Sequence, residues 1–132
     1  MSFGFSLGDI VTLSTLAFKV LESCKNSTSE FMSLSSEIDS LYQILEHTTH
    51  SARLLLEDDG ERLHHVIADC NCLLDEISAY LGKYSSLGDS SVKRRRPRQQ
   101  LAWAIKNNVT AFRSRLISNI TILTALNTNL MQ

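Results

Sequence analysis

Apolar residues recur every three or four positions along several stretches of the chain, which is the spacing of amphipathic helices. Ser6 and Asp9 have the spacing of a capping box, and Phe5 and Ile10 that of a hydrophobic staple, so a helix is predicted to begin there. The helix is expected to end near Lys25. Its apolar side holds Ile10, Leu13, Leu16, Ala17, Val20, Leu21 and Cys24.

This first predicted helix carries no charge between Asp9 and Lys19. An ordinary surface helix has Lys or Glu on its outward face. Here the outward positions are Thr12, Ser14, Thr15 and Phe18. The helix is therefore either buried on most sides or suited to an apolar environment.

A second predicted helix opens at Ser27-Thr28-Ser29-Glu30, again with capping-box spacing, and ends between His50 and Leu56. Its apolar seam alternates steps of three and four, as in a coiled coil. The seam consists of Phe31, Leu34, Ile38, Leu41 and Leu45. Asp58-Asp59-Gly60 predicts a turn, and a third helix follows with Gly82 as its stop signal. Its apolar positions include Leu63, Val66, Ile67, Cys70, Leu73, Leu74, Ile77, Tyr80, Leu81 and Tyr84.

Residues 82–96 are rich in Ser, Gly and clustered charge, which predicts a mobile basic loop. Pro97 suits the first turn of the following helix. Asn107-Asn108 predicts a break, with a short helix over about 97–106 and a long one over about 109–130. The pattern thus predicts an all-α protein: a four-to-five-helix antiparallel bundle forming a single domain over residues 1–132.

Charge is distributed unevenly along the chain. Residues 1–92 hold five Lys/Arg and all 14 Asp/Glu, a net charge of −9. Residues 93–132 hold eight Lys/Arg and no acid, a net charge of +8. Two interpretations remain open: the basic part meets an anionic partner, or the two parts attract each other within one bundle.

Five basic residues form the strongest compositional feature: Lys93, Arg94, Arg95, Arg96 and Arg98. They can bind anionic lipid headgroups, act in nuclear import or contact nucleic acid, or simply keep a loop solvated. No aromatic residue is interleaved with the run, which argues against nucleic acid as a partner.

The sequence holds no arrangement typical of catalysis or of a cofactor site. The cysteines are Cys24, Cys70 and Cys72, and positions two apart on a helix do not face each other, so free thiols are expected. His47 and His50 lack further ligands at metal-site spacing, and Asp58, Asp59 and Glu61 lack that of a calcium loop. We expect no enzyme activity, no metal and no cofactor.

No apolar stretch reaches the roughly 18 residues of a spanning helix, and no secretory signal is recognisable. Cytoplasmic localisation is therefore expected.

Two sequence segments carry a resemblance to a known family. The opening Met-Ser-Phe-Gly-Phe-Ser-Leu-Gly-Asp-Ile, with a helix ending near Cys24-Lys25, is fairly specific. The second segment is Leu101-Ala102-Trp103-Ala104 after a basic stretch. Together they resemble the N-terminal HeLo-like helical domains of fungal STAND proteins, the NOD-like receptors of filamentous fungi. The resemblance covers nearly the whole chain.

The resemblance implies a cell-death or heterokaryon-incompatibility effector bundle excised from a larger receptor, whose NTPase and sensor domains would cluster it. Clustered bundles would then target the plasma membrane through the first helix, with the basic loop as an electrostatic anchor. The implied membrane-contact residues are Phe3, Phe5, Ile10, Val11, Leu13, Leu16, Ala17 and Phe18. The alternative is a protein–protein adaptor that self-associates or binds a partner helix without touching lipid.

Overall fold

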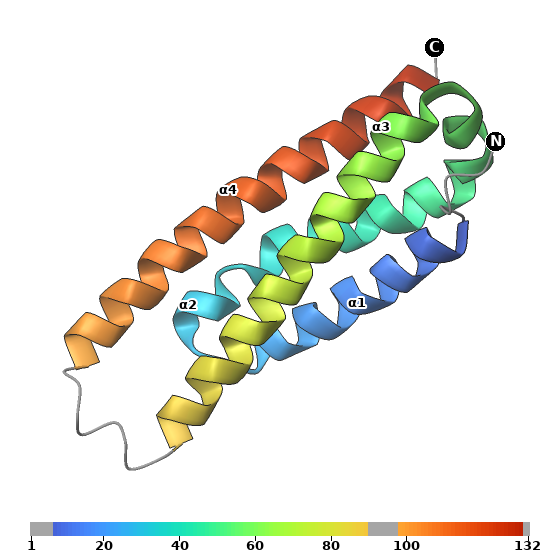
Figure 1. Cartoon of the computed structure of the whole chain (residues 1–132). Helices are drawn as coiled ribbons and strands as arrows, with labels where there is room; N and C mark the ends of the chain where they lie inside the picture. The colour runs from blue at the N-terminus through green and yellow to red at the C-terminus, as the bar shows by residue number, and fades with distance from the viewer. Residues whose placement is uncertain (1–6, 90–97, 131–132) are drawn as a thin grey trace.

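The computed structural model describes residues 7–89 and 98–130. These residues form α1 (Leu7–Lys25), α2 (Ser29–Met32), α3 (Ser35–Asp89) and α4 (Arg98–Leu130), with no strand among them (Figure 1). The all-α prediction is confirmed, and the arrangement is a helical bundle. Asp9 lies in the first turn of α1, beside the positive end of the helix dipole, as expected.

The long helix α3 is a hairpin rather than a straight rod. Asp59 is its one residue with non-helical backbone angles, φ −133° and ψ 35°. The chain reverses direction there (Figure 1), so residues 35–58 form a first arm and residues 60–89 a second arm. The turn predicted at Asp58-Asp59-Gly60 is therefore correctly located, although it takes one residue instead of a loop.

The hairpin of α3 lies between the other two long helices. α1 and α4 both pack extensively against α3 but hardly contact each other. The start of α1, the bend in α3 and the end of α4 lie at one end of the bundle (Figure 1). The short α2 lies toward the opposite end, where it contacts α1, α3 and α4.

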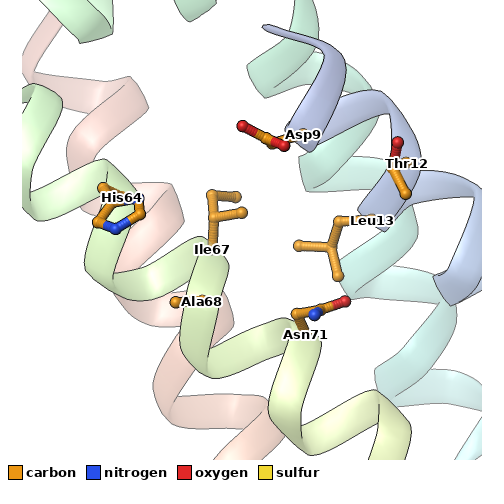
Figure 2. A pocket seen from close by; sticks show the side chains of 7 residues that line it. All are labelled: Asp9, Thr12, Leu13, His64, Ile67, Ala68 and Asn71. Atoms are coloured by element: carbon orange, nitrogen blue, oxygen red, sulfur yellow. The ribbon is translucent and has the colours of Figure 1, made fainter. Parts of the chain in front are cut away.

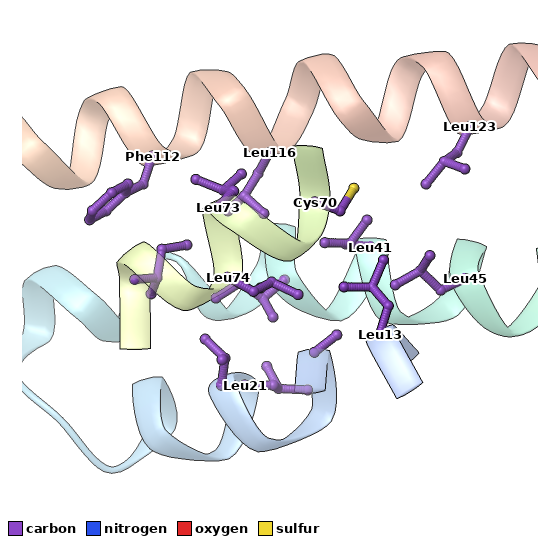
Figure 3. Close-up of a cluster of buried hydrophobic side chains, with 14 of the residues drawn as sticks. Leu13, Leu21, Leu41, Leu45, Cys70, Leu73, Leu74, Phe112, Leu116 and Leu123 are labelled. Atoms are coloured by element: carbon purple, nitrogen blue, oxygen red, sulfur yellow. The ribbon is translucent and has the colours of Figure 1, made fainter. Parts of the chain in front are cut away.

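One continuous apolar core joins the three long helices (Figure 3). The seam predicted for the second helix is entirely inside it, because each of its side chains is at most 1% exposed. Those five side chains are Phe31, Leu34, Ile38, Leu41 and Leu45. The periodic pattern therefore reports core packing, and this seam is covered by the chain's own helices.

The structure contradicts the expectation of one helix starting at Ser27. The four-residue α2 comes first, its N-cap is Thr28, and the Thr28 side chain makes no capping hydrogen bond. The helix is interrupted at Ser33, and the Leu34 N–H donates to the Phe31 carbonyl in a tighter turn. Serine favours such breaks, and the freed Ser33 carbonyl accepts a bond from Arg113 of α4 at 2.8 Å. The local sequence cannot reveal that partner.

Two further predictions of helix ends are wrong. Gly82 does not stop the third helix, since α3 continues to Asp89. Residues 82–89 are thus helical and not part of a loop, while 90–97 lie outside the described residues. One glycine costs a helix only about 1 kcal/mol, and Leu81 next to it is held in the core.

The predicted break at Asn107-Asn108 is also wrong, because α4 is continuous from Arg98 to Leu130. The Asn108 side-chain amide donates to the Ala104 carbonyl at 2.9 Å and to the Tyr80 hydroxyl at 2.8 Å. Burial of Val109 and Phe112 against the core outweighs the weak helix propensity of the asparagines.

Candidate interaction surface on the first helix

The inner face of α1 is tied to α3 by apolar packing and by one polar contact. Ile10, Leu13 and Ala17 are at most 1% exposed. Ser14, predicted to point outward, is instead 3% exposed, and its hydroxyl donates to Glu46 Oε2 at 2.6 Å. The prediction failed because the acceptor comes from a residue 32 positions away on α3. A charged acceptor makes this a strong hydrogen bond.

The outer face of α1 presents large apolar side chains to solvent. Leu7 is 47% exposed, Val11 46% and Phe18 48%. Positions separated by four and seven residues share a helix face, so these three side chains form one line, here called the α1 stripe. The Phe18 ring lies 5.7 Å from the Tyr42 ring of α3 and continues the apolar surface onto the neighbouring helix.

The residues implied as membrane contacts are split between core and surface. Ile10, Leu13 and Ala17 are buried in the bundle, and Leu16 is partly buried against it. Val11 and Phe18 are exposed, whereas Phe3 and Phe5 lie outside the described residues. Sequence reasoning missed Leu7, although its four-residue spacing from Val11 is a detectable signal.

The basic run cannot be placed in the same way. Lys93, Arg94, Arg95 and Arg96 lie outside the described residues. Arg98 is the first residue of α4. The start of α4 lies at the end of the bundle away from the start of α1 (Figure 1).

A small hollow of about 240 Å³ lies between α1 and the second arm of α3 (Figure 2). Leu13, Ile67 and Ala68 supply apolar lining, and polar side chains supply the remainder. The polar residues are Asp9, Thr12, His64 and Asn71. Asp9 is exposed, so the hollow is an open groove, and none of its lining residues belongs to the α1 stripe.

The thiols have contrasting environments. Cys24 and Cys70 are fully buried, and burial raises the pKa of Cys24 to about 11 and that of Cys70 to about 12. Asp69 contributes to the raised pKa of Cys70. Cys72 is exposed, and all three thiols are free. The thiolate is the reactive form of cysteine, and the raised pKa values of Cys24 and Cys70 disfavour it. These two thiols therefore serve core packing.

Within the described ranges 7–89 and 98–130, no three His, Cys, Asp or Glu side chains gather as metal ligands would. None of the helices in these ranges combines the length and apolarity needed to cross a bilayer. The α1 stripe is therefore the surface feature considered for function.

Comparison of the chain with protein-family models, with curated proteins and with solved structures gives no match.

Proposed function

We propose that the chain is an effector bundle of an immune-type receptor, which associates with membranes through α1 once copies are clustered. The observation that carries the proposal is the α1 stripe: three half-exposed apolar side chains on a helix with no charge between Asp9 and Lys19. The resemblance to HeLo-like domains of fungal STAND proteins supports the same role, including an antiparallel bundle and recruitment to the plasma membrane.

Magnitudes favour contact through the stripe over extraction of α1 from the bundle. Pulling α1 away would expose its buried face and the matching face of α3, at a cost on the order of 10 kcal/mol. That is comparable with the whole stability of an ordinary domain. The α1 stripe already faces solvent and needs no such separation.

One copy binds a membrane weakly on this basis, which explains why clustering is needed. Covering the remaining exposed area of Leu7, Val11 and Phe18 yields about 2–4 kcal/mol. Linking several copies multiplies that small contribution through effective concentration, without any new contact. The basic run adds attraction to anionic lipid of about 1 kcal/mol per residue near the surface.

A leakage assay on anionic vesicles tests the proposal. The bundle is fused to a trimeric coiled coil, and release of a trapped dye is compared with that of the unfused chain. We expect leakage from the forced trimer and strong loss of leakage for Val11→Glu with Phe18→Glu. Leu54→Glu is the matched control, because Leu54 is 55% exposed on α3 and off the stripe. Leu13 is a poor probe, since its burial makes Leu13→Glu a folding mutation.

Two results would count against membrane action: no leakage from the forced trimer, or equal leakage from the stripe and control variants. The adaptor alternative predicts a different pattern. The trimer would leave vesicles intact, while light scattering would show association that Val11→Glu and Phe18→Glu abolish. The buried seam from Phe31 to Leu45 gives that adaptor no free surface in this conformation.

A further inference from the structure

The bend in α3 is confined to a very short segment of the chain. Over the 55 residues of α3, Asp59 alone leaves the helical conformation. Its local polar contact is an ion pair of Arg62 Nη1 with the partly exposed Asp59 Oδ1 at 3.8 Å. Gly60 follows, and a Cβ atom added there would meet no heavy atom within 4 Å. The bend therefore does not depend on the small size of Gly60.

The buried residues of the two arms would share one stripe if α3 were straight. Leu55 and Leu63 are the core residues flanking the bend, and both are 0% exposed. Eight residues of regular helix separate them by about 80° around the axis, within the width of one apolar face. The same stripe would hold Leu41, Leu45, Ala52, Leu55, Leu63, Val66, Cys70, Leu73 and Ile77. A straight α3 would be about 80 Å long.

The bend also divides the bundle into two complementary halves, called here the N-half (7–58) and the C-half (60–89 and 98–130). They meet through apolar packing and through specific contacts. The Phe31 ring of the N-half lies 5.7 Å from the Tyr80 ring of the C-half, measured between ring centroids. The Tyr80 ring in turn lies 5.6 Å from the Phe112 ring. Asn127 Nδ2 donates to Thr48 Oγ1 at 3.0 Å inside the core.

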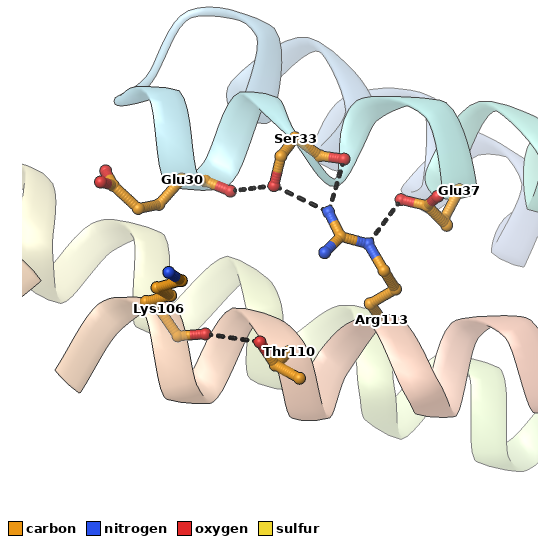
Figure 4. A network of polar contacts seen from close by, with 6 residues as sticks. All are labelled: Glu30, Ser33, Glu37, Lys106, Thr110 and Arg113. Atoms are coloured by element: carbon orange, nitrogen blue, oxygen red, sulfur yellow. Dashed lines mark hydrogen bonds and ion pairs between the residues drawn. The ribbon is translucent and has the colours of Figure 1, made fainter. Parts of the chain in front are cut away.

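The halves attract each other electrostatically as well. The N-half carries three Lys/Arg and eight Asp/Glu, a net charge of −5, while the C-half carries six and five, a net charge of +1. One ion pair joins the two halves: Arg113 Nε of α4 donates to Glu37 Oε1 at 3.2 Å (Figure 4). Each half thus needs a half with the matching apolar face and the matching partner for this ion pair.

We propose that a second copy of this chain can supply that half, through a domain-swapped dimer in which α3 straightens at Asp59. The N-half of each copy then packs on the C-half of the other. Every contact between halves is kept, and the bend itself is what changes. Short hinges are known to favour such exchange. The swap gives the proposed effector a route to self-association that involves no lipid.

Hinge substitutions test the first part of this proposal. Asp59→Ala raises helix propensity at the one non-helical position of α3 in each of two chains. We expect a dimerisation constant at least about 10-fold tighter than that of the natural sequence. A flexible insertion of Gly-Ser-Gly-Ser between Asp59 and Gly60 should leave only monomer. Masses are measured by light scattering after equilibration near the unfolding midpoint, where halves can exchange.

Mixing two charge-reversed chains separates a swap from an ordinary surface dimer. Glu37→Arg alone and Arg113→Glu alone each place like charges across the halves. In a swapped heterodimer of these two variants, both junctions regain an opposite-charge pair. We expect heterodimer in the mixture, little dimer in either variant alone, and monomer restored in the double variant.

A distance measurement covers the case in which charge reversal prevents folding. Ser40 and Ser78 are exposed on the two arms. In a straight helix their Cα atoms would be about 57 Å apart, far more than a hairpin permits. Spin labels on Ser40→Cys and Ser78→Cys, in a Cys72→Ser background diluted with unlabelled chain, report the distance within one chain.

A dimer fraction without the long distance overturns the proposal. A hinge variant that remains monomeric at millimolar concentration, or a dimer indifferent to the Gly-Ser insertion, does the same. None of these results bears on vesicle leakage, so the two proposals can fail separately.

Discussion

At the scale of single residues, burial decides what the cysteines can do. Cys24 and Cys70 lie in the core, and the lost hydration of their thiolates raises the pKa of each thiol from its ordinary value of 9.0. Cys72, two positions from Cys70, points to solvent. Helix geometry alone predicts that residues two apart face different ways, but which of them is buried depends on the packing of the second arm.

We therefore predict selective thiol labelling. At pH 8 an alkylating reagent should modify Cys72 rapidly, and should reach Cys24 and Cys70 only when the chain unfolds. Mass spectrometry after short exposures counts the labelled thiols, and Cys72→Ser is the control that should remain unlabelled. Equal labelling of all three cysteines in the folded protein would contradict the placement.

The same thiols predict a stability change at alkaline pH. They hold their protons more tightly in the folded chain than in the unfolded chain. Their contribution to the free energy of unfolding is therefore complete below pH 9. It decreases as pH rises toward about 11 for Cys24 and about 12 for Cys70. Urea unfolding across this range should show a shallower alkaline decline for Cys24→Ala; an unchanged slope would argue against the thiol as the cause.

At the scale of elements, a single side chain of α4 stabilises the break between α2 and α3. Arg113 Nη2 donates to both the Ser33 carbonyl and the Ser33 hydroxyl at 2.8 Å, and its Nε bonds Glu37 (Figure 4). The Ser33 hydroxyl in turn donates to the Glu30 carbonyl at 2.6 Å. One guanidinium thus satisfies a carbonyl freed by the break and fixes the start of α3.

We predict that Arg113→Ala lowers the free energy of unfolding by about 2 kcal/mol, because charge-assisted bonds in a partly covered site are lost. Arg113→Lys should recover only part of it, since an ammonium cannot bridge Ser33 and Glu37 in the same geometry. Denaturant midpoints measure both effects.

Arg115 provides the matched control from the same helix. It makes a two-bond contact with Glu76 at 2.9 Å, and this hydrogen bonding lowers the pKa of the Glu76 carboxyl. The two side chains are 46% and 52% exposed. Exposed ion pairs contribute little, so Arg115→Ala should cost less than about 1 kcal/mol. A larger loss for Arg115→Ala than for Arg113→Ala would reverse the assignment.

At the scale of the whole molecule, the opposite charges of the two halves and the basic run can act together. The halves hold each other within the bundle through contacts such as Glu37 with Arg113. The basic run Lys93, Arg94, Arg95, Arg96 and Arg98 concentrates five positive charges within six residues of the sequence. A basic cluster of this kind attracts the bundle to an anionic surface.

Neutralising Lys93, Arg94, Arg95, Arg96 and Arg98 to Gln should therefore weaken binding of the clustered bundle to anionic vesicles. At about 1 kcal/mol per residue, the loss for five residues is about three and a half orders of magnitude at low salt. The difference should shrink in about 0.5 M salt, because salt screens the attraction between the basic residues and the lipid headgroups. Vesicle co-sedimentation measures it. Equal binding of both chains to anionic vesicles at low salt would show that the run is no lipid anchor.

The sequence alone was sufficient for the all-α class, the position of the turn near Asp59 and most of the core. These depend on local turn chemistry and on apolar periodicity, which the chain carries in every short window. The continuity of α3 through Gly82 and of α4 through Asn108 required the tertiary structure, because core packing around Leu81 and Phe112 outweighs weak local propensity. The burial of Ser14 and the break at Ser33 required it too, since Glu46 and Arg113 are distant in sequence. The α1 stripe also required the tertiary structure, because apolar periodicity does not show which apolar side chains the neighbouring helices leave exposed.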